Sequence, residues 1–129
     1  MKFVGRTETI SFPSLGIEGI SAKVDTGAYG NSLHVDSIFL SEKGVSFSCF
    51  GREYFFSEYR TVKVKNSFGV EQERYSIDVT VALGNMTYLV SFSLADRKKM
   101  KHPALIGRRF LRKFGYMVDV SRKDVNDKA

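Results

Sequence analysis

The sequence predicts a small all-β domain with one short helix, and three features of the chain support this. Short runs of β-branched and aromatic residues recur along its length, separated by Gly, Asn and Ser. Within residues 60–65, Val62 and Val64 alternate with polar neighbours, which is the period of a strand with one solvent-facing side. Only residues 108–114 carry apolar side chains at helical spacing.

The expected elements begin with a hairpin, because the turn Pro13-Ser14-Leu15-Gly16 lies between two strand-like runs. A second hairpin has Asn66-Ser67-Phe68-Gly69 at its tip, and Gly84-Asn85 marks a further turn. The helix is placed at 108–114 because Phe110, Leu111 and Phe114 would share one face. The expected strands are 3–12, 17–24, 32–40, 45–50, 60–65, 73–83, 86–94 and 116–120.

Length and composition limit the organisation of the chain. Its 129 residues fit one domain, so we expect 1–129 to form a single domain with a flexible polar tail at 121–129. Hydrophobic residues make up 43%, enough for a packed core, which excludes disorder as the overall description. No apolar run is long enough for a signal peptide or a membrane span, so we expect a cytoplasmic protein without a membrane partner.

Charge and cysteine content limit the classes of partner and of site that the chain can have. The net charge of +6 and the pI near 9.5 favour an anionic partner without choosing between nucleic acid, an acidic peptide and a membrane surface. The single cysteine, Cys49, excludes an intrachain disulfide framework and a cysteine-rich zinc site. Because Cys49 lies in an apolar run, we interpret it as a half-buried strand residue rather than a reactive thiol.

One segment carries an acidic residue in a position suited to catalysis. Val24-Asp25-Thr26-Gly27-Ala28 places a carboxylate at the abrupt end of an apolar strand, and the glycine permits a tight turn. An Asp-Thr-Gly tripeptide on its own is more typical of an ordinary turn than of a catalytic site. The apolar run Ala104-Leu105-Ile106-Gly107-Arg108, at the start of the expected helix, changes this interpretation.

Together the two segments resemble the signatures of retropepsin-like aspartic peptidases. In that family an apolar-apolar-Gly strand crosses beneath the catalytic loop and a helix follows it. The predicted order of elements is similar as well: opening hairpin, catalytic loop, flap hairpin, strand pair, Leu-Ile-Gly, helix and final strand. The resemblance implies a retropepsin-like half-barrel with one short helix near the C-terminus.

A narrower resemblance covers nearly the whole chain, and the motifs that carry it are 22–28, 32–34, 70–75, 105–111 and 118–123. Its motifs are similar to those of a bacterial and archaeal RimK-associated family known as ATP-dependent zinc proteases, whose members often accompany ligases that add glutamates to proteins. This implies a role in processing acidic peptides. Tyr29-Gly30-Asn31 departs from the short threonine-containing stretch expected in the family.

The resemblance implies an aspartic endopeptidase that acts as a homodimer on peptide or protein substrates, because the chain has one Asp-Thr-Gly and the chemistry needs two carboxylates sharing a proton. Asp25 is then the catalytic residue, Thr26 links the two loops, and Gly27 leaves room for the scissile carbonyl. The hairpin tip would close over the substrate as a flap. The residues expected to contact substrate are Ala28, Tyr29, Ser67, Phe68, Gly69 and Ile106.

Three alternatives to this mechanism remain open. A zinc peptidase needs three or four ligands, and Asp25, His34 and Asp36 are the candidates, although His34 fits a hydrogen-bonded strand residue better and His102 a surface residue. Nucleic-acid binding would use the eight Lys and Arg of residues 97–113, which lack an RNA-binding signature and fit a solvated basic face. A peptide-binding or dimerisation module of the same fold, without turnover, is the third. We expect no metal and no cofactor, and the chain has no Gly-rich loop for ATP.

Overall fold

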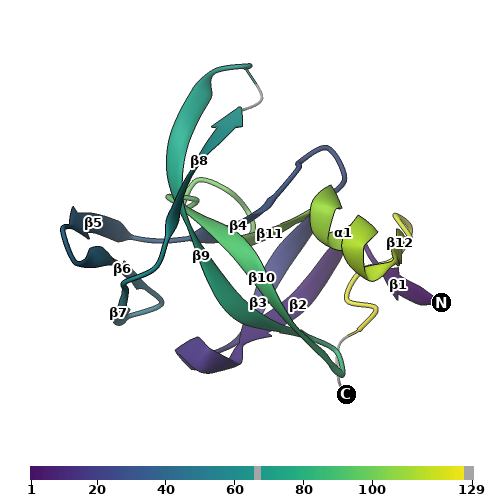
Figure 1. Ribbon diagram of the computed structural model, residues 1–129. Helices are drawn as coiled ribbons and strands as arrows, with labels where there is room; N and C mark the ends of the chain where they lie inside the picture. Colours follow the sequence, from purple (N-terminus) through teal and green to yellow (C-terminus); the bar gives the residue numbers. More distant parts are fainter. Residues whose placement is uncertain (66–67, 127–129) are drawn as a thin grey trace.

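The computed structural model describes residues 1–65 and 68–126, in which strands predominate and one short α-helix lies near the C-terminal end, as predicted (Figure 1). No helix in these ranges is long and apolar enough to cross a bilayer. The elements in chain order are β1 (Lys2–Val4), β2 (Thr7–Phe12), the 3-10 helix η1 (Pro13–Leu15), β3 (Ile17–Asp25), β4 (Asn31–His34), β5 (Ser37–Ser41), β6 (Gly44–Cys49), β7 (Arg52–Phe56), β8 (Arg60–Lys65), β9 (Glu71–Leu83), β10 (Met86–Ala95), β11 (Ala104–Gly107), α1 (Arg108–Phe114) and β12 (Tyr116–Val118).

The centre of the molecule is a small barrel. The strands follow the order β10-β4-β11-β3-β2-β9, and the ring closes because β9 also pairs with β10. The later part of β9 pairs with both neighbours, Leu83 with Ile10 of β2 and Val81 with Tyr88 of β10. Its earlier part leaves the barrel and pairs with β8 alone in a projecting hairpin (Figure 1).

Alternating apolar residues build the core of this barrel. In β9 every second side chain from Ile77 to Leu83 is buried, which is the pattern of a strand with one face on the core. The rings of Phe12 and Phe92 meet edge to face, with centroids 5.0 Å apart, and both are fully buried. Cys49 is also fully buried, and burial, aided by Asp36, raises the pKa of its thiol to about 11. It is therefore more buried than predicted, and its thiol is a poor nucleophile.

Two predicted strands are divided in the structure. The run 3–12 breaks between β1 and β2 because the C-terminal segment crosses Gly5, where a Cβ atom would lie 2.6 Å from the carbonyl oxygen of Arg122. The run 32–40 breaks because the chain changes sheets: Val35 N–H donates to Ala95 of the barrel, and Asp36 N–H to Ser48 of another sheet. Hydrophobic pattern alone does not locate such breaks, since the partners are distant in sequence.

A three-stranded sheet, β5-β6-β7, extends to one side of the barrel (Figure 1). Its last strand, β7, was not predicted from the sequence. Tyr54 and Phe56 of β7 stack on Phe47 of β6, with ring centroids 5.4 and 5.8 Å apart. This stacking against a neighbouring strand accounts for an element that local alternation does not reveal.

The two ends of the chain lie together. Strands β1 and β12 pair in parallel, Lys2 with Tyr116 through Val4 with Val118. Beyond them, Arg6 N–H donates to Arg122 and Asp124 N–H donates to Thr7, so residues 122–124 follow the start of β2. The flexibility expected of 121–129 remains a prediction, and residues 127–129 lie outside the described residues.

A buried carboxylate holds this C-terminal segment in place. Glu8 of β2 is fully buried. Its Oε2 atom accepts N–H bonds from Gly5 and Val125, at 2.8 and 3.0 Å, and its Oε1 atom accepts one from Asn126 at 3.0 Å. Hydrogen bonds to a charged acceptor are stronger than neutral ones, so these three bonds offset the free-energy cost of burying the carboxylate. They also hold both chain ends in place.

We expect Glu8→Gln to lower the free energy of unfolding by roughly 2–4 kcal/mol, because an amide NH₂ would then face backbone donors that cannot accept its protons. Urea denaturation of both proteins measures the difference. Glu18→Gln is the control, since it makes the same chemical change at an exposed position of β3. Equal stability of native protein and Glu8→Gln would contradict the role assigned to this carboxylate.

Candidate active site

Asp25 is the last residue of β3, and the barrel fixes its position. Strand β3 runs parallel to β11, with Val24 opposite Ile106 and Asp25 opposite Gly107, and both apolar side chains are buried. The Oδ1 atom of Asp25 accepts the N–H of Gly27 at 2.9 Å, so the tight turn orients the carboxylate. Its side chain is 31% exposed, which leaves it accessible to a substrate.

The loop after Asp25 caps helix α1. The helix has no side-chain cap, and its first N–H groups need acceptors. Arg108 N–H donates to the carbonyl of Ala28 at 2.8 Å, and Arg109 N–H to that of Tyr29 at 3.0 Å. One set of bonds therefore satisfies the helix end and holds the loop rigid.

Gly107 allows the loop to lie this close to the strand and helix beneath it. A Cβ atom at this position would lie 2.4 Å from the carbonyl oxygen of Gly30 and 2.8 Å from that of Tyr29. Real side chains do not approach backbone so closely, so only glycine fits without a shift of the loop. This is the physical reason why an apolar strand that supports the Asp-Thr-Gly loop ends in glycine.

Asn31 is a site residue that sequence reasoning missed. Its Oδ1 atom accepts the N–H of Gly107 at 3.0 Å, while its Nδ2 atom donates to the carbonyl of Ser91 at 3.1 Å. Asn31 thus joins β4, β10 and β11 below the loop. Nothing in the local sequence separates such an asparagine from an ordinary turn residue, because both partners are at least 60 residues away.

Tyr29 lies beside two arginines on the outer side of the loop. Its side chain is 60% exposed. The guanidinium groups of Arg108 and Arg109 lie 5.4 and 5.9 Å from its ring centroid, within the range of cation–π attraction. Arg108 also donates to the carbonyl of Gly27 at 3.2 Å. Tyr29 belongs to the stretch 29–31, which differs from the threonine-containing stretch expected in the family. At this position an exposed aromatic ring therefore lies on the surface of the loop.

The structure does not bring all the residues expected to contact substrate to one surface. Ala28 and Tyr29 adjoin Asp25 in the loop, whereas Ile106 is only 1% exposed and packs in the core under it. Phe68 and Gly69 lie at the tip of the β8–β9 hairpin, with Phe68 89% exposed. Ser67 lies outside the described residues.

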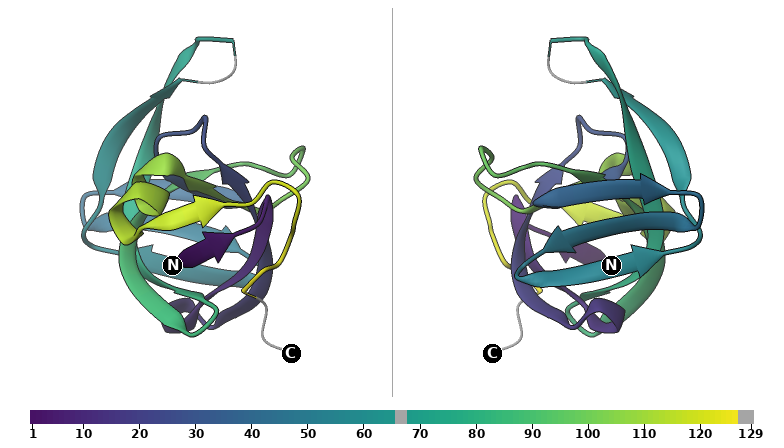
Figure 2. Two further views of the ribbon diagram at one scale, coloured as in Figure 1. Left: turned by 90° about the vertical axis from the view of Figure 1, so that its right-hand side faces the viewer. Right: turned by 90° about the vertical axis from the view of Figure 1, so that its left-hand side faces the viewer.

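The β8–β9 hairpin rises on the same side of the barrel as the loop that joins β3 to β4 (Figure 2). At its base, Arg60 of β8 pairs with Asp78 of β9, and Ser91 of β10 bonds to the same carboxylate. These bonds, that from Arg60 first, hold the pKa of Asp78 below its usual value. The hairpin is therefore anchored where it leaves the barrel, while its tip extends beyond the barrel.

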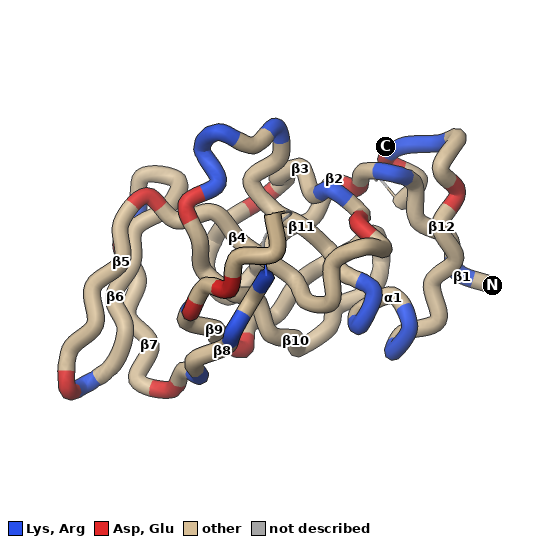
Figure 3. Tube along the Cα trace, turned by 90° about the horizontal axis from the view of Figure 1, so that it is seen from above, with Lys and Arg blue, Asp and Glu red and all other residues tan. Residues whose placement is uncertain are grey.

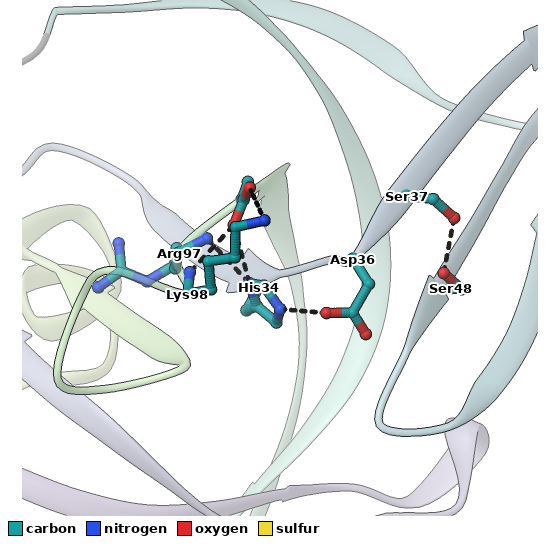
Figure 4. Close-up of polar contacts among 7 residues, drawn as sticks. His34, Asp36, Ser37, Ser48, Arg97 and Lys98 are labelled. Atoms are coloured by element: carbon teal, nitrogen blue, oxygen red, sulfur yellow. Dashed lines mark hydrogen bonds and ion pairs between the residues drawn. The ribbon is translucent and has the colours of Figure 1, made fainter.

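His34 anchors the loop that follows β10, because it binds the backbone of Arg97 (Figure 4). Its Nδ1 atom accepts the N–H of Arg97 at 2.8 Å, so Nε2 carries the proton and donates to Asp36 at 2.7 Å. The prediction of a hydrogen-bonded strand histidine is confirmed. His102, expected at the surface, is instead half-buried, with Nδ1 2.8 Å from the hydroxyl oxygen of Ser21.

A zinc centre does not fit this arrangement. Within residues 1–65 and 68–126, no three or more His, Cys, Asp and Glu side chains converge as a metal-binding group. His34 uses both ring nitrogens in hydrogen bonds to Arg97 and Asp36, which leaves neither free for a metal.

The barrel carries one Asp-Thr-Gly loop, an apolar strand that ends in glycine supports this loop from below, and a hairpin projects on the same side of the barrel. These features together define a retropepsin-like protein. A model of the RimB-like family, described as retropepsin-like aspartic endopeptidase RimB, matches residues 51–129. The chain belongs to this family. The matched residues include the hairpin, the supporting strand and α1, whereas Asp25 lies before them.

Relatives extend the similarity beyond residues 51–129. A probable alpha-L-glutamate ligase of Desulfotalea psychrophila is 30% identical over 119 residues, and one of Shewanella pealeana is 32% identical over 117. The alignments cover 83% and 81% of this chain but 26% of each relative, so the chain spans about a quarter of the length of the curated relatives it matches. A crystal structure of a DUF785 protein of unknown function from Legionella pneumophila is 26% identical, with a TM-score of 0.75 over 98% of both chains.

Proposed function

We propose that the chain is one subunit of a homodimeric aspartic endopeptidase, in which Asp25 and its symmetry mate activate a water molecule. The observation that carries this proposal is the rigid presentation of one partly exposed carboxylate. The Gly27 N–H orients Asp25, and the loop behind it is held by Gly107, Arg108 and Asn31. A catalytic group has to be held within a fraction of an ångström to act, and this network supplies that support.

Two carboxylates are needed because one must accept a proton while the other donates one. Like charges a few ångströms apart cannot both ionise easily, so the pair shares a proton and titrates as a unit. The ionised member takes a proton from water as the oxygen attacks the scissile carbonyl, and the protonated member donates to the carbonyl oxygen. A twofold axis through the loop supplies the second Asp25 from an identical chain. Thr26 then lies where it can hydrogen-bond across that axis, and Gly27 keeps the space above the dyad open.

The placement of the β8–β9 hairpin on the same side of the barrel as the Asp25 loop supports a role as a flap. Closure over a bound peptide would exclude water from the dyad, with Phe68 and Gly69 at the tip as contacts. Gly69 has a φ of +78°, which suits a tight turn. Ile106 is buried under the loop, so its role in this proposal is to support Asp25, whereas Ser67 lies outside the described residues.

We further propose acidic or glutamate-rich peptides as substrates. The net charge of +6 favours anionic partners. The relatives named as probable alpha-L-glutamate ligases contain a segment similar to this chain within a longer protein, which supports an association with glutamate-containing chains.

Cleavage of a mixed peptide library tests the reaction class. The native protein is incubated with peptides that include polyglutamate tails, from acidic to neutral pH, with and without a metal chelator. We expect chelator-resistant cleavage, because the dyad needs no metal. Cleavage abolished by the chelator would establish a metal-dependent reaction instead. No cleavage under any condition would leave a peptide-binding module of the same fold.

A further inference from the structure

A cavity of about 450 Å³ lies beside β3, the strand that ends at Asp25, and four segments of the chain line it. Arg6 precedes β2, Lys23 belongs to β3, Lys101 lies in the loop before β11, and Lys123 lies in the C-terminal segment. Against these four cations the lining holds one acidic side chain, Asp124. A hollow with such an excess of positive charge attracts anions.

We propose that this cavity is a substrate subsite that binds the carboxylate of an acidic side chain next to the scissile bond, with Lys101 and Lys123 as specificity-determining residues. The inference rests on the proposed endopeptidase function and deepens it. It assigns the preference for acidic peptides to one cavity instead of to the charge of the whole surface.

Lys23 connects the cavity to the catalytic carboxylate. Its Nζ atom lies 3.9 Å from the Oδ2 atom of Asp25. Residues two apart on a strand point to the same face, so Ser21, Lys23 and Asp25 form one row along β3. Ser21 and Lys23 line the cavity, which therefore lies along the same face as Asp25. A peptide bound across Asp25 can thus place a neighbouring side chain in it.

His102 and Ser21 form an uncharged polar pair in this lining. The Nδ1 atom of His102 lies 2.8 Å from the hydroxyl oxygen of Ser21. Partial burial, followed by the charges of Lys101, Lys23 and Arg97, lowers the pKa of His102, and Asp124 opposes this only in part. Its imidazole is accordingly neutral at pH 7, as expected for a group in a positive field, and can hydrogen-bond a carboxylate.

Two buried side chains, Arg97 and Glu8, hold the segments that carry Lys101 and Lys123 in place. Arg97, 8% exposed, donates from Nε to the carbonyl of His102 at 3.2 Å, and its backbone N–H binds His34, which fixes both ends of the loop that carries Lys101. The prediction that the whole run 97–113 is a solvated basic face is therefore wrong for Arg97. Glu8 fixes the segment that carries Lys123 through its bonds to Val125 and Asn126.

Figures 2 and 3 show the loop after β10 and the C-terminal segment on the same side of the molecule, with basic residues on both. Because these segments are anchored, less conformational entropy is lost when the lysines bind an anion. Lysine suits this role because its ammonium group is a point charge with rotatable donors, which accepts a carboxylate without a fixed geometry.

Binding to an inactive protein tests the subsite without any need for turnover. In the Asp25→Asn background, calorimetry compares short synthetic peptides that differ only in Glu or Gln at one position. Lys101→Gln and Lys123→Gln are introduced singly and together. Lys43→Gln is the matched control, because it removes the same charge from the exposed turn between β5 and β6.

We expect the parent to bind the Glu peptide about tenfold more tightly than the Gln peptide, and the double variant to lose most of this preference. The Lys43→Gln control should retain it. A double variant that still prefers the Glu peptide as strongly as the parent would overturn the subsite. Free glutamate or inorganic phosphate that binds as tightly as the Glu peptide would also overturn it, in favour of a small-anion site.

The binding test separates this inference from the proposed function. A preference for Glu that depends on Lys101 and Lys123 supports binding of an acidic side chain in this cavity. If the native protein then cleaves no peptide, the catalytic proposal fails and the cavity binds peptides without turnover. If the native protein cleaves acidic peptides and neither Lys101→Gln nor Lys123→Gln changes this cleavage, the catalytic proposal is supported and the subsite is contradicted.

Discussion

If the proposed dyad operates, Asp25→Asn is expected to reduce kcat/KM for peptide cleavage by roughly 10³-fold or more, while the fold and the proposed dimer persist. Asparagine has the same shape, and its amide oxygen can still accept the N–H that Gly27 donates to Oδ1. The amide cannot take a proton from water, so neither half of the dyad can complete its role. The loss should therefore lie in kcat, with little change in peptide affinity.

Steady-state kinetics on the best library peptide measure this loss, and sedimentation velocity and thermal unfolding measure assembly and stability. Asp119→Asn makes the same change at a carboxylate that is bound by Ser121 and lies outside the site. We expect this control to retain activity. Full activity of Asp25→Asn would exclude the dyad mechanism, and a dimer that falls apart would show that the carboxylate has a structural role instead.

Gly107→Ala is expected to have the second largest effect, about a 10²-fold loss of kcat/KM together with roughly 1–3 kcal/mol of stability. The added methyl group would meet the carbonyl oxygen of Gly30 at 2.4 Å, which is backbone and cannot rotate away. The loop must move, and Asp25 moves with it because Ala28 N–H donates to the Asp25 carbonyl at 3.2 Å. Displacement of a catalytic group by even 1 Å costs about this much in rate.

Gly30→Ala supplies the control for stability within the same loop. A Cβ atom at Gly30 meets no heavy atom within 4 Å, so the methyl group enters open space. We expect its free energy of unfolding to stay within about 0.5 kcal/mol of the native value. If Gly107→Ala and Gly30→Ala are equally stable, the close contact between Gly107 and the loop does not contribute to the stability of the fold.

The elements that the sequence could predict are those specified by local pattern. The helix Arg108–Phe114 has the predicted boundaries, because Phe110 and Leu111 face the core and Gly115 ends it in a left-handed conformation. Strand β9 begins two residues earlier than predicted. The position of the Asp25 loop at the end of β3 could also be predicted from the sequence, because an apolar strand stops abruptly at an acidic turn.

The elements and roles that the sequence could not predict depend on contacts between distant residues. The change of sheets at Val35 and Asp36 follows from partners at Ala95 and Ser48, and β7 follows from stacking on Phe47. In the site, Asn31 acts through Gly107, 76 residues away. The cavity beside Lys23 joins four segments that lie apart in the chain, which no local spacing indicates.

Subunit mixing tests the shared dyad most directly. Native protein and Asp25→Asn are unfolded, combined in equal amounts and refolded, so that random pairing gives about one quarter native dimers and one half mixed dimers. If both Asp25 residues form one centre, mixed dimers are inactive and the mixture retains about a quarter of the activity of native protein at the same total concentration. Retention of about half the activity would mean that each chain acts alone, and would contradict the dyad.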